Sequence, residues 1–514
     1  MSKDNHELSR REFIRQSACA ALELTGLVNT MGFLRLTNAS VLQGNLALNG
    51  DYKALVCIYL SGGNDAHNML VPMGDPADNP IRADYEAARS HVQIPSSDLH
   101  PLTIPADSQA FKQHYGDGTF PMGIHPSAPQ LAELFNNKDL AFMCNVGSLA
   151  FPIVDRQSYL DKKVQLPPNL FAHDKQQMQW QTSMAEKNGT VGWGGRLADL
   201  LHAGYNGDAS KASMSISLDG VSTFQRGLLP ETAAFTVSPT GVRSLKGFGT
   251  NYASAVEIGN TFESPLYKNT SEGHRLKMLE GLMRLSSENL LENEVAQRFR
   301  SSRMVEGAVG ESLTSAGASG VNFDQIFASA DNRLGDQLKI IAKLITGQTA
   351  IGNRRQIFFA RVNGYDNHNS LLESHAPLMD ELGSALKAFR DALVAAGQWD
   401  NVVTFTASDF ARTLIPNTNG TDHAWGSHAI VMGGPVNGGD FHGHYPSLKL
   451  GDHPESLDAD ARGLIIPTTA VDQFSAPMAH WFGADSSAIE TIFPNLARFD
   501  DPLTSSAANL KFIS

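Results

Sequence analysis

The chain contains 514 residues, of which 42% are hydrophobic and 18% charged, and its formal net charge is −13 at pH 7. This length allows two or three average domains, or a single large α/β domain with insertions. The negative balance and the lack of a Lys/Arg-rich block exclude a nucleic-acid-binding surface. No apolar run reaches the roughly 18 residues that a membrane-spanning helix needs, so we expect no stable membrane span.

The first residues have the pattern of an export signal. In the stretch SRREFIR, Arg10 and Arg11 precede two apolar residues, which is typical of a twin-arginine signal. A mildly apolar stretch follows, and Ala39-Ser40 offers the small residues of a cleavage site. We interpret residues 1–45 as signal and linker, and expect the twin-arginine translocase to export the protein to the periplasm or the extracellular space. An amphipathic first helix with a chance arginine pair is the alternative.

From residue 54 onward, apolar strand candidates alternate with amphipathic segments. Residues 54–60, ALVCIYL, form a continuous apolar run that is expected of a strand buried on both faces. Similar runs occur within residues 131–148, 354–368 and 400–410, and residues 374–398 have helical periodicity. This alternation predicts an α/β fold with a mostly parallel sheet, in which ligands bind beyond the carboxyl ends of the strands.

The middle of the chain has a different pattern. Residues 213–220, SMSISLDG, are a short strand candidate, and residues 273–300 contain helical segments separated by polar turns. Candidate metal ligands are few between about residue 200 and residue 336. We therefore predict that residues 46–514 form one domain, with an inserted helical cap over the sheet at about 200–336.

Acidic and imidazole side chains follow two of the predicted strands. Asp366 and His368 are two residues apart, so in extended backbone both side chains point the same way and can hold one ion. Asp65 follows the first strand after two glycines, and its carboxylate can bridge two metal ions. An acid in that position is, however, more often a turn or N-cap residue. Mixed Asp/His ligation suits zinc, manganese or iron better than calcium.

The stretch NTNGTDHAWGSH, residues 417–428, carries three further candidates. Asp422 and His423 are adjacent, so in an extended loop they diverge and can serve two ions a few ångströms apart. His428 comes within reach if Gly426 lets the chain turn back. Each histidine taken singly is more often a surface or hydrogen-bonded side chain. Together, however, Asp-x-His and Asp-His at the ends of two strands favour a metal site.

The stretch SDFART adds an acid and a base. Asp409 is expected either to ligate a metal or to orient a ligand from outside the first layer of contacts. Arg412 is expected to clamp an anionic group in bidentate fashion, and the alternative is that the two side chains pair with each other.

Six stretches, in order, resemble the DUF1501 family of exported bacterial proteins, and the resemblance runs from about Ala54 to Phe493. They are LSGGNDAHNMLVP, GWGGRLADL, NGYDNH, SDFART, GTDHAWGSH and GGPVNGGDFHGHYP. Members of this family are similar to the alkaline phosphatase and sulfatase superfamily. The resemblance implies a mostly parallel sheet with helices on both faces, and a site that often holds two metal ions.

The same resemblance implies which residues ligate the metal. It selects Asp65, Asp366, His368, Asp422, His423 and His428, with His442 or His444 as substitutes for the last. One residue separates the Asp and His of the central pair here, where phosphatases commonly have three.

The nucleophile expected from the superfamily is not found in its usual place. The family often has Ser-His where this chain has Ala172-His173, so no hydroxyl is present at that position. Ser148 and Thr182 lie in the right interval, and nothing in the sequence distinguishes either of them. Ala411 also stands where the family usually has glycine.

These observations lead to two hypotheses. The first is an exported hydrolase of phosphate or sulfate esters, in which two divalent ions, zinc or manganese, hold an anionic small-molecule or polymeric substrate. In it Arg412 binds a non-bridging oxygen and His173 acts as acid or base or holds substrate, while water replaces the missing alcohol. The second is a non-catalytic exported or cell-surface protein of the same fold that binds a polymer or a protein. A redox enzyme is a third reading, but no dinucleotide fingerprint or cysteine cluster is visible.

Overall fold

The computed structural model describes residues 51–207, 210–239, 241, 245–249, 252–257, 264–285, 290–507 and 509–514. The predicted signal and linker, residues 1–45, lie outside this part of the chain. Within it, no helix combines the length and the apolar character needed to cross a membrane.

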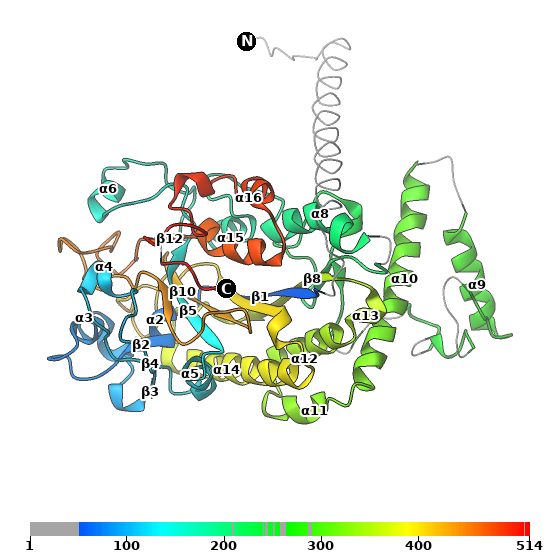
Figure 1. Cartoon of the computed structure of the whole chain (residues 1–514), viewed down its shortest axis with the longest axis horizontal. Coiled ribbons are helices and arrows are strands. Elements are labelled where there is room, and N and C mark those ends of the chain that lie inside the picture. The colour runs from blue at the N-terminus through cyan, green and yellow to red at the C-terminus, as the bar shows by residue number, and fades with distance from the viewer. Residues whose placement is uncertain are drawn as a thin grey trace, which may run out of the picture.

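A mixed sheet forms the centre of the described structure (Figure 1). Its order is β11-β5-β10-β9-β1-β8-β6-β7, and β12 pairs with β5 off this path. The strands are β1 (Lys53–Ser61), β5 (Leu140–Gly147), β6 (Ser215–Ser217), β7 (Phe235–Thr236), β8 (Arg355–Asn363), β9 (Val402–Ser408), β10 (Ser427–Met432), β11 (Phe441–Gly443) and β12 (Thr469–Ala470). β1 runs parallel to both β8 and β9, whereas β10 is antiparallel to β9 and β5. The predicted mostly parallel α/β sheet is confirmed.

Helices cover both faces of this sheet because its central strands are apolar on both sides. In β1, Val56 and Ile58 belong to one core, and Leu55 and Cys57 belong to the other. Helices α5 (Pro129–Asn136), α12 (Arg333–Thr346) and α14 (Leu371–Ala395) supply the first core, on the lower side in Figure 1. Helices α8 (Trp193–Tyr205), α15 (Val471–Phe482) and α16 (Ser486–Ile492) supply the second, on the upper side.

Shorter elements surround this three-layer core. The helices are α2 (Ala66–Met69), α3 (Pro80–Arg89), α4 (Lys112–Tyr115), α6 (Arg156–Leu160), α7 (His173–Thr182), α11 (Phe323–Ile326) and α13 (Gln348–Ile351). A second, three-stranded sheet has the order β2 (Leu70–Pro72), β4 (Met122–Ile124), β3 (His100–Pro101).

The segment predicted to be a cap contributes both strands and helices. β6 pairs with β8 and β7 pairs with β6, so the segment extends the central sheet at one edge. Beyond that edge lie α10 (Leu290–Gly317) and, outermost, α9 (Ser271–Met283) (Figure 1). The division into one domain and a cap stays a prediction.

Candidate metal centre

The loops that follow β1, β8 and β9 meet at the carboxyl end of the sheet. Gly62 directly follows β1 in a left-handed conformation with φ +116°, and a Cβ built on it would lie 2.5 Å from the backbone nitrogen of Asp366. A Cβ on Gly420 would similarly come 2.1 Å from the carbonyl carbon of His368. Glycine at these two positions therefore permits the close approach that brings the β8 loop against its neighbours.

Three imidazoles converge on one carboxylate oxygen. Oδ1 of Asp366 lies 3.0 Å from Nε2 of His368 and 3.4 Å from Nε2 of both His173 and His423. The ligand atoms of His173, Asp366 and His423 all lie within 4.8 Å of one another, so these residues form a group with the spacing of a metal site. His368 is outside that group, but its Nε2 lies close to the same carboxylate oxygen of Asp366.

In each of these imidazoles the other ring nitrogen contacts an oxygen. His173 Nδ1 lies 2.7 Å from the Asp409 carboxylate, His423 Nδ1 lies 2.7 Å from the Phe171 carbonyl, and His368 Nδ1 lies 3.2 Å from the Asp422 carboxylate. A carbonyl and an ionised carboxylate can only accept, so each Nδ1 donates its proton. This arrangement leaves the Nε2 lone pairs free and is the usual outer layer around metal-ligating histidines.

Two features of the site fit a bound cation. Nε2 of His173 is buried and has no hydrogen-bond partner in the described part of the chain. Nε2 of His368 and Nε2 of His423 face each other at 2.9 Å. Because both rings carry their proton on Nδ1, only a proton or a metal cation between the two lone pairs makes that contact favourable. The donor set of nitrogen and carboxylate oxygen is that of zinc and related ions.

The site is open to solvent on one side and closed below. The Asp366 side chain is 48% exposed and that of His368 is 39% exposed, whereas Asp409 and Arg412 are buried. Solutes can therefore reach the carboxylate and the imidazoles.

Asp409 orients His173. One oxygen of its buried carboxylate accepts from the Tyr59 hydroxyl at 2.6 Å, and the other accepts from the Gly62 amide at 3.2 Å and from His173 Nδ1. Both oxygens are thus engaged. Of the two roles expected for Asp409, the structure places it in the orienting one.

Arg412 braces the loops from beneath the site. Its buried guanidinium donates to the carbonyl oxygens of Gly62, Gly63 and Thr421, and to the carboxylate of Asp366. Arg412 therefore pairs with Asp366 and not with Asp409. Its guanidinium was expected to clamp a substrate anion, but protein oxygens already occupy its donors.

Asp65 and His428 lie outside the group. Asp65 is buried, caps α2 by accepting from the Asn68 amide, and forms an ion pair with Arg89. Nδ1 of His428 accepts from the Asn145 amide at 3.3 Å, and its ring stacks on Tyr445 with the centroids 5.1 Å apart. Asp65 and His428, both expected in the ligand set, thus have partners other than the members of this group.

The other residues raised by the sequence occupy different surroundings. His442 contacts the Asn437 carbonyl and His444 contacts the Ala507 carbonyl, and neither belongs to the group around Asp366. Ser148 and Thr182, the two hydroxyls in the nucleophile interval, are both buried. Ala172 is the N-cap residue of α7, directly before His173, and offers no hydroxyl.

The electrostatic setting differs from one ligand candidate to the next. The hydrogen bond to Asp409 raises the pKa of His173, whereas burial lowers the pKa of His423. Burial alone would raise the pKa of Asp366, but the hydrogen bond and charge of Arg412, with His173 and His368, lower it overall. Asp366 is therefore ionised and His423 neutral near pH 7, which are the forms that bind metals.

The sequence predicts that His173 is an acid, a base or a substrate contact. It does not indicate that His173 is a candidate metal ligand. His173 is the first residue of α7, and the loop before it contains Phe171, whose carbonyl accepts from His423. This position at the start of a helix is the signal that could have identified His173. Tyr59 was missed as well, because in the sequence it is one more apolar position of a buried strand.

Comparison with known proteins gives a family and matches among solved structures. No curated protein matches the chain. The solved structure titled "Crystal structure of Ps i-CgsB in complex with k-i-k-neocarrahexaose" is 7% identical in sequence, with a TM-score of 0.28, over 88% of this chain and 78% of that one. Residues 52–462 match the family described as "Protein of unknown function (DUF1501)", and the chain therefore belongs to this family.

Proposed function

We propose that the protein is an exported, metal-dependent hydrolase of phosphate or sulfate esters. The observation that carries the proposal is the set of three Nε2 atoms around Asp366, each on a ring whose Nδ1 donates to a fixed acceptor. Acceptors of this kind fix the tautomer and the orientation of three imidazoles at once. That loss of freedom has no return in stability unless the site binds a ligand.

The ligand sets divide into two overlapping positions. His173, Asp366 and His423 form the first, and His368 with the shared Asp366 marks the second. Ions that share Asp366 in this way would lie a few ångströms apart, as in binuclear hydrolases. A bound divalent ion neutralises negative charge on the oxygens of an anionic ester, and the nitrogen-rich ligand set favours zinc over manganese.

The substrate is proposed to be an anionic ester, either a small molecule or a polymer. Arg412 is engaged from below. The guanidinium of Arg462 is exposed and pairs with Asp422 at 3.4 Å and with Asp460 at 2.7 Å, so it would bind a substrate anion in exchange for these partners. Since position 172 is alanine and Ser148 and Thr182 are buried, water is the nucleophile that we propose.

Export through the twin-arginine pathway is part of the proposal, and it rests on Arg10-Arg11 in the first residues. This route carries folded proteins, which suits a site assembled from loops far apart in the sequence and filled before export. The proposed location is the periplasm or the extracellular space.

A second candidate function is a non-catalytic exported protein that keeps the metal site and binds a polymer or another protein. Alanine at position 172 favours this candidate, because the alcohol of a covalent mechanism is missing there.

Hydrolysis of 4-nitrophenyl phosphate and 4-nitrophenyl sulfate distinguishes the two candidates. We expect turnover by the purified protein that a chelator abolishes and that added zinc or manganese restores. His423→Ala should lower kcat/KM at least about 100-fold, because it removes one of the three ligands of the group His173, Asp366 and His423. His453→Ala, at an exposed histidine elsewhere, is the matched control and should leave kcat/KM unchanged. Turnover that survives both the chelator and His423→Ala would contradict the hydrolase proposal.

A further inference from the structure

Helices α9 and α10, the hairpin α9–α10, project from the edge of the central sheet (Figure 1). The C-terminal half of α10 is anchored in the main core, where Val309 and Ala316 are buried. Its N-terminal half is not, since Val295 and Phe299 are 55% and 47% exposed. Only the outer part of the hairpin therefore lacks cover from the body of the protein.

A small internal core fixes the two helices relative to each other. Leu276 of α9 packs with Tyr252 in a cluster separate from the two large cores. The buried carboxylate of Glu280 on α9 accepts from Arg303 on α10 at 2.8 Å, and the Arg303 guanidinium lies 4.0 Å from the centre of the Tyr252 ring. This ion pair holds the hairpin together, so its outer apolar side chains are available for other contacts.

The outer surface of the hairpin concentrates exposed apolar side chains. Of fourteen large apolar residues that are well exposed in the described part of the chain, five lie on the hairpin, namely Met278, Leu282, Val295, Phe299 and Met304, and a sixth, Leu285, follows the end of α9. Met278 and Leu282 are four apart on α9, and Val295 and Phe299 are four apart on α10, so each helix carries a short apolar stripe. Such a concentration is characteristic of an interaction surface and not of scattered surface residues.

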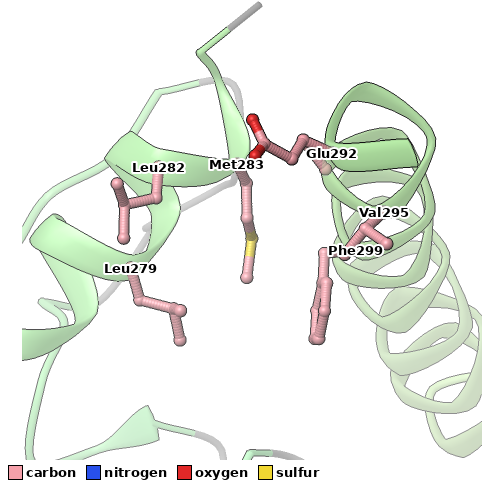
Figure 2. Close-up of a pocket in the computed structure, with 7 residues that line it drawn as sticks. Leu279, Leu282, Met283, Glu292, Val295 and Phe299 are labelled. Carbon is pink, nitrogen blue, oxygen red and sulfur yellow. The ribbon is translucent and has the colours of Figure 1, made fainter. Parts of the chain in front are cut away.

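The two stripes border a groove. A cavity of about 420 Å³ lies between the helices, with Leu279, Leu282 and Met283 on one side and Val295 and Phe299 on the other (Figure 2). Glu292 lies at one end of it, and in Figure 2 Met283 and Phe299 extend into the space between the two helices. The groove is lined almost wholly by apolar side chains.

The charge of this region singles out a second copy of the chain as the occupant. Residues 264–317 contain seven Lys/Arg and seven Glu, so they are formally neutral in a chain of net charge −13. Two copies repel each other elsewhere on their surfaces, and a neutral apolar segment is where they can approach at least electrostatic cost. The same balance gives no excess of positive charge that would draw the hairpin to an anionic membrane.

We propose that the hairpin α9–α10 packs against the same hairpin of a second copy, related by a two-fold axis. In such an interface the apolar stripe of α9 in one copy meets the groove of the other, and the reverse contact is made at the same time. Four helices then enclose the side chains that two helices leave exposed, as in a four-helix bundle. This inference does not depend on the proposed function.

Light scattering and sedimentation of the exported full-length protein test the proposal. The wild type should be a dimer that dissociates on dilution over roughly a hundredfold range of concentration. Leu282→Glu and Phe299→Glu each place a charge in the groove, and each should raise the dissociation constant at least about 100-fold. Val154→Glu, at an exposed apolar residue far from the hairpin in sequence, is the matched control and should remain dimeric.

Two further measurements keep the outcome unambiguous. Circular dichroism and thermal unfolding should show that all three variants are folded, since each changed side chain is exposed. Flotation with vesicles of neutral and of anionic phospholipid should leave the wild type unbound. A wild type that is monomeric throughout, a dimer that Leu282→Glu and Phe299→Glu leave intact, or flotation lost in those variants would each overturn the proposal.

Discussion

At the scale of single residues, the outer layer around the imidazoles determines what the site can bind. His173 donates to Asp409, and the same carboxylate accepts from Tyr59 and from the Gly62 amide. These contacts fix the carboxylate from three directions. The histidine is therefore held with its Nε2 lone pair toward Asp366 and loses little freedom when a metal binds.

Asp409→Asn tests this dependence. The amide has one acceptor oxygen where the carboxylate has two, so it cannot accept from Tyr59 and from His173 at the same time. We expect affinity for zinc to fall about 10- to 100-fold, measured by competition with a chromophoric chelator. Asp174→Asn, at the exposed neighbour of His173 on α7, is the control and should bind like the wild type. Equal affinities in the two variants would contradict the orienting role.

His67 makes stability depend on pH independently of the metal site. Burial lowers its pKa to about 4, Asp65 opposes this shift, Arg89 reinforces it, and His428 lies against the ring. In the unfolded chain the pKa returns to about 6.5, so between these values the unfolded state binds more protons. The contribution of His67 is therefore fully present above pH 6.5 and is lost as pH falls toward 4.

Urea unfolding of the wild type and His67→Gln checks this expectation. Between about pH 7.5 and about pH 5 the wild type should lose about 2 kcal/mol more of its unfolding free energy than the variant. Comparison with the variant cancels other groups that titrate in this range, such as buried Asp472, whose pKa is raised by burial to about 7. Equal losses would show that His67 does not titrate on unfolding.

At the scale of elements, the site depends on how closely the ends of β1 and β8 approach. Gly62→Ala should destabilise the protein for two reasons, namely its left-handed conformation and the contact of the new Cβ with Asp366. Gly74 is also left-handed, with φ +98°, but the nearest atom to a Cβ there is 3.9 Å away. Gly74→Ala thus isolates the conformational cost.

We expect Gly74→Ala to lower the unfolding free energy by about 1 kcal/mol, and Gly62→Ala by roughly 2–5 kcal/mol because the clash adds to the strain. Only Gly62→Ala should also weaken zinc binding, since it displaces the backbone of Asp366. Chemical unfolding and metal titration measure the two effects. Equal destabilisation by the two substitutions would show that the strand ends tolerate more separation than the structure indicates.

The sequence predicted the elements around the site better than it predicted the side-chain partners. Apolar runs identified β1, β8 and β9, and the two-residue spacing correctly placed Asp366 and His368 on one side of the loop. The adjacent Asp422 and His423 do diverge, the former toward His368 Nδ1 and the latter toward Asp366.

What the sequence could not provide was the set of tertiary contacts. The sequence around Asp65 does not indicate that its carboxylate pairs with Arg89, at the end of α3. His428 follows the predicted loop, yet β10 carries it against Tyr445 and away from the group. The buried pairing of Arg412 with Asp366 is equally a product of packing between distant segments.

At the scale of the whole molecule, the predicted α/β sheet with helices on both faces is the arrangement that the structure has, because its central strands are apolar on both faces and must be covered twice. Export from the cytoplasm by the twin-arginine route is a proposal, and it can be tested on the first residues alone.

Arg10→Lys/Arg11→Lys should retain the protein in the cytoplasm, because the twin-arginine translocase reads the arginine pair itself. Fractionation of cells followed by immunoblotting measures the distribution. Arg15→Lys, a substitution of the same chemistry just beyond the pair, should leave export unchanged. Export that persists without the arginine pair would contradict the proposed route.

The central claim is that His173, His368 and His423 surround Asp366 to hold transition-metal ions. Elemental mass spectrometry of the natively exported protein, purified without chelator or histidine tag, tests it most directly. We expect about two ions per chain in the wild type and in His453→Gln, and at most one in His423→Gln, because this variant loses a ligand of the group His173, Asp366 and His423. A folded wild type that carries no metal, and that takes up none on titration, would contradict the account.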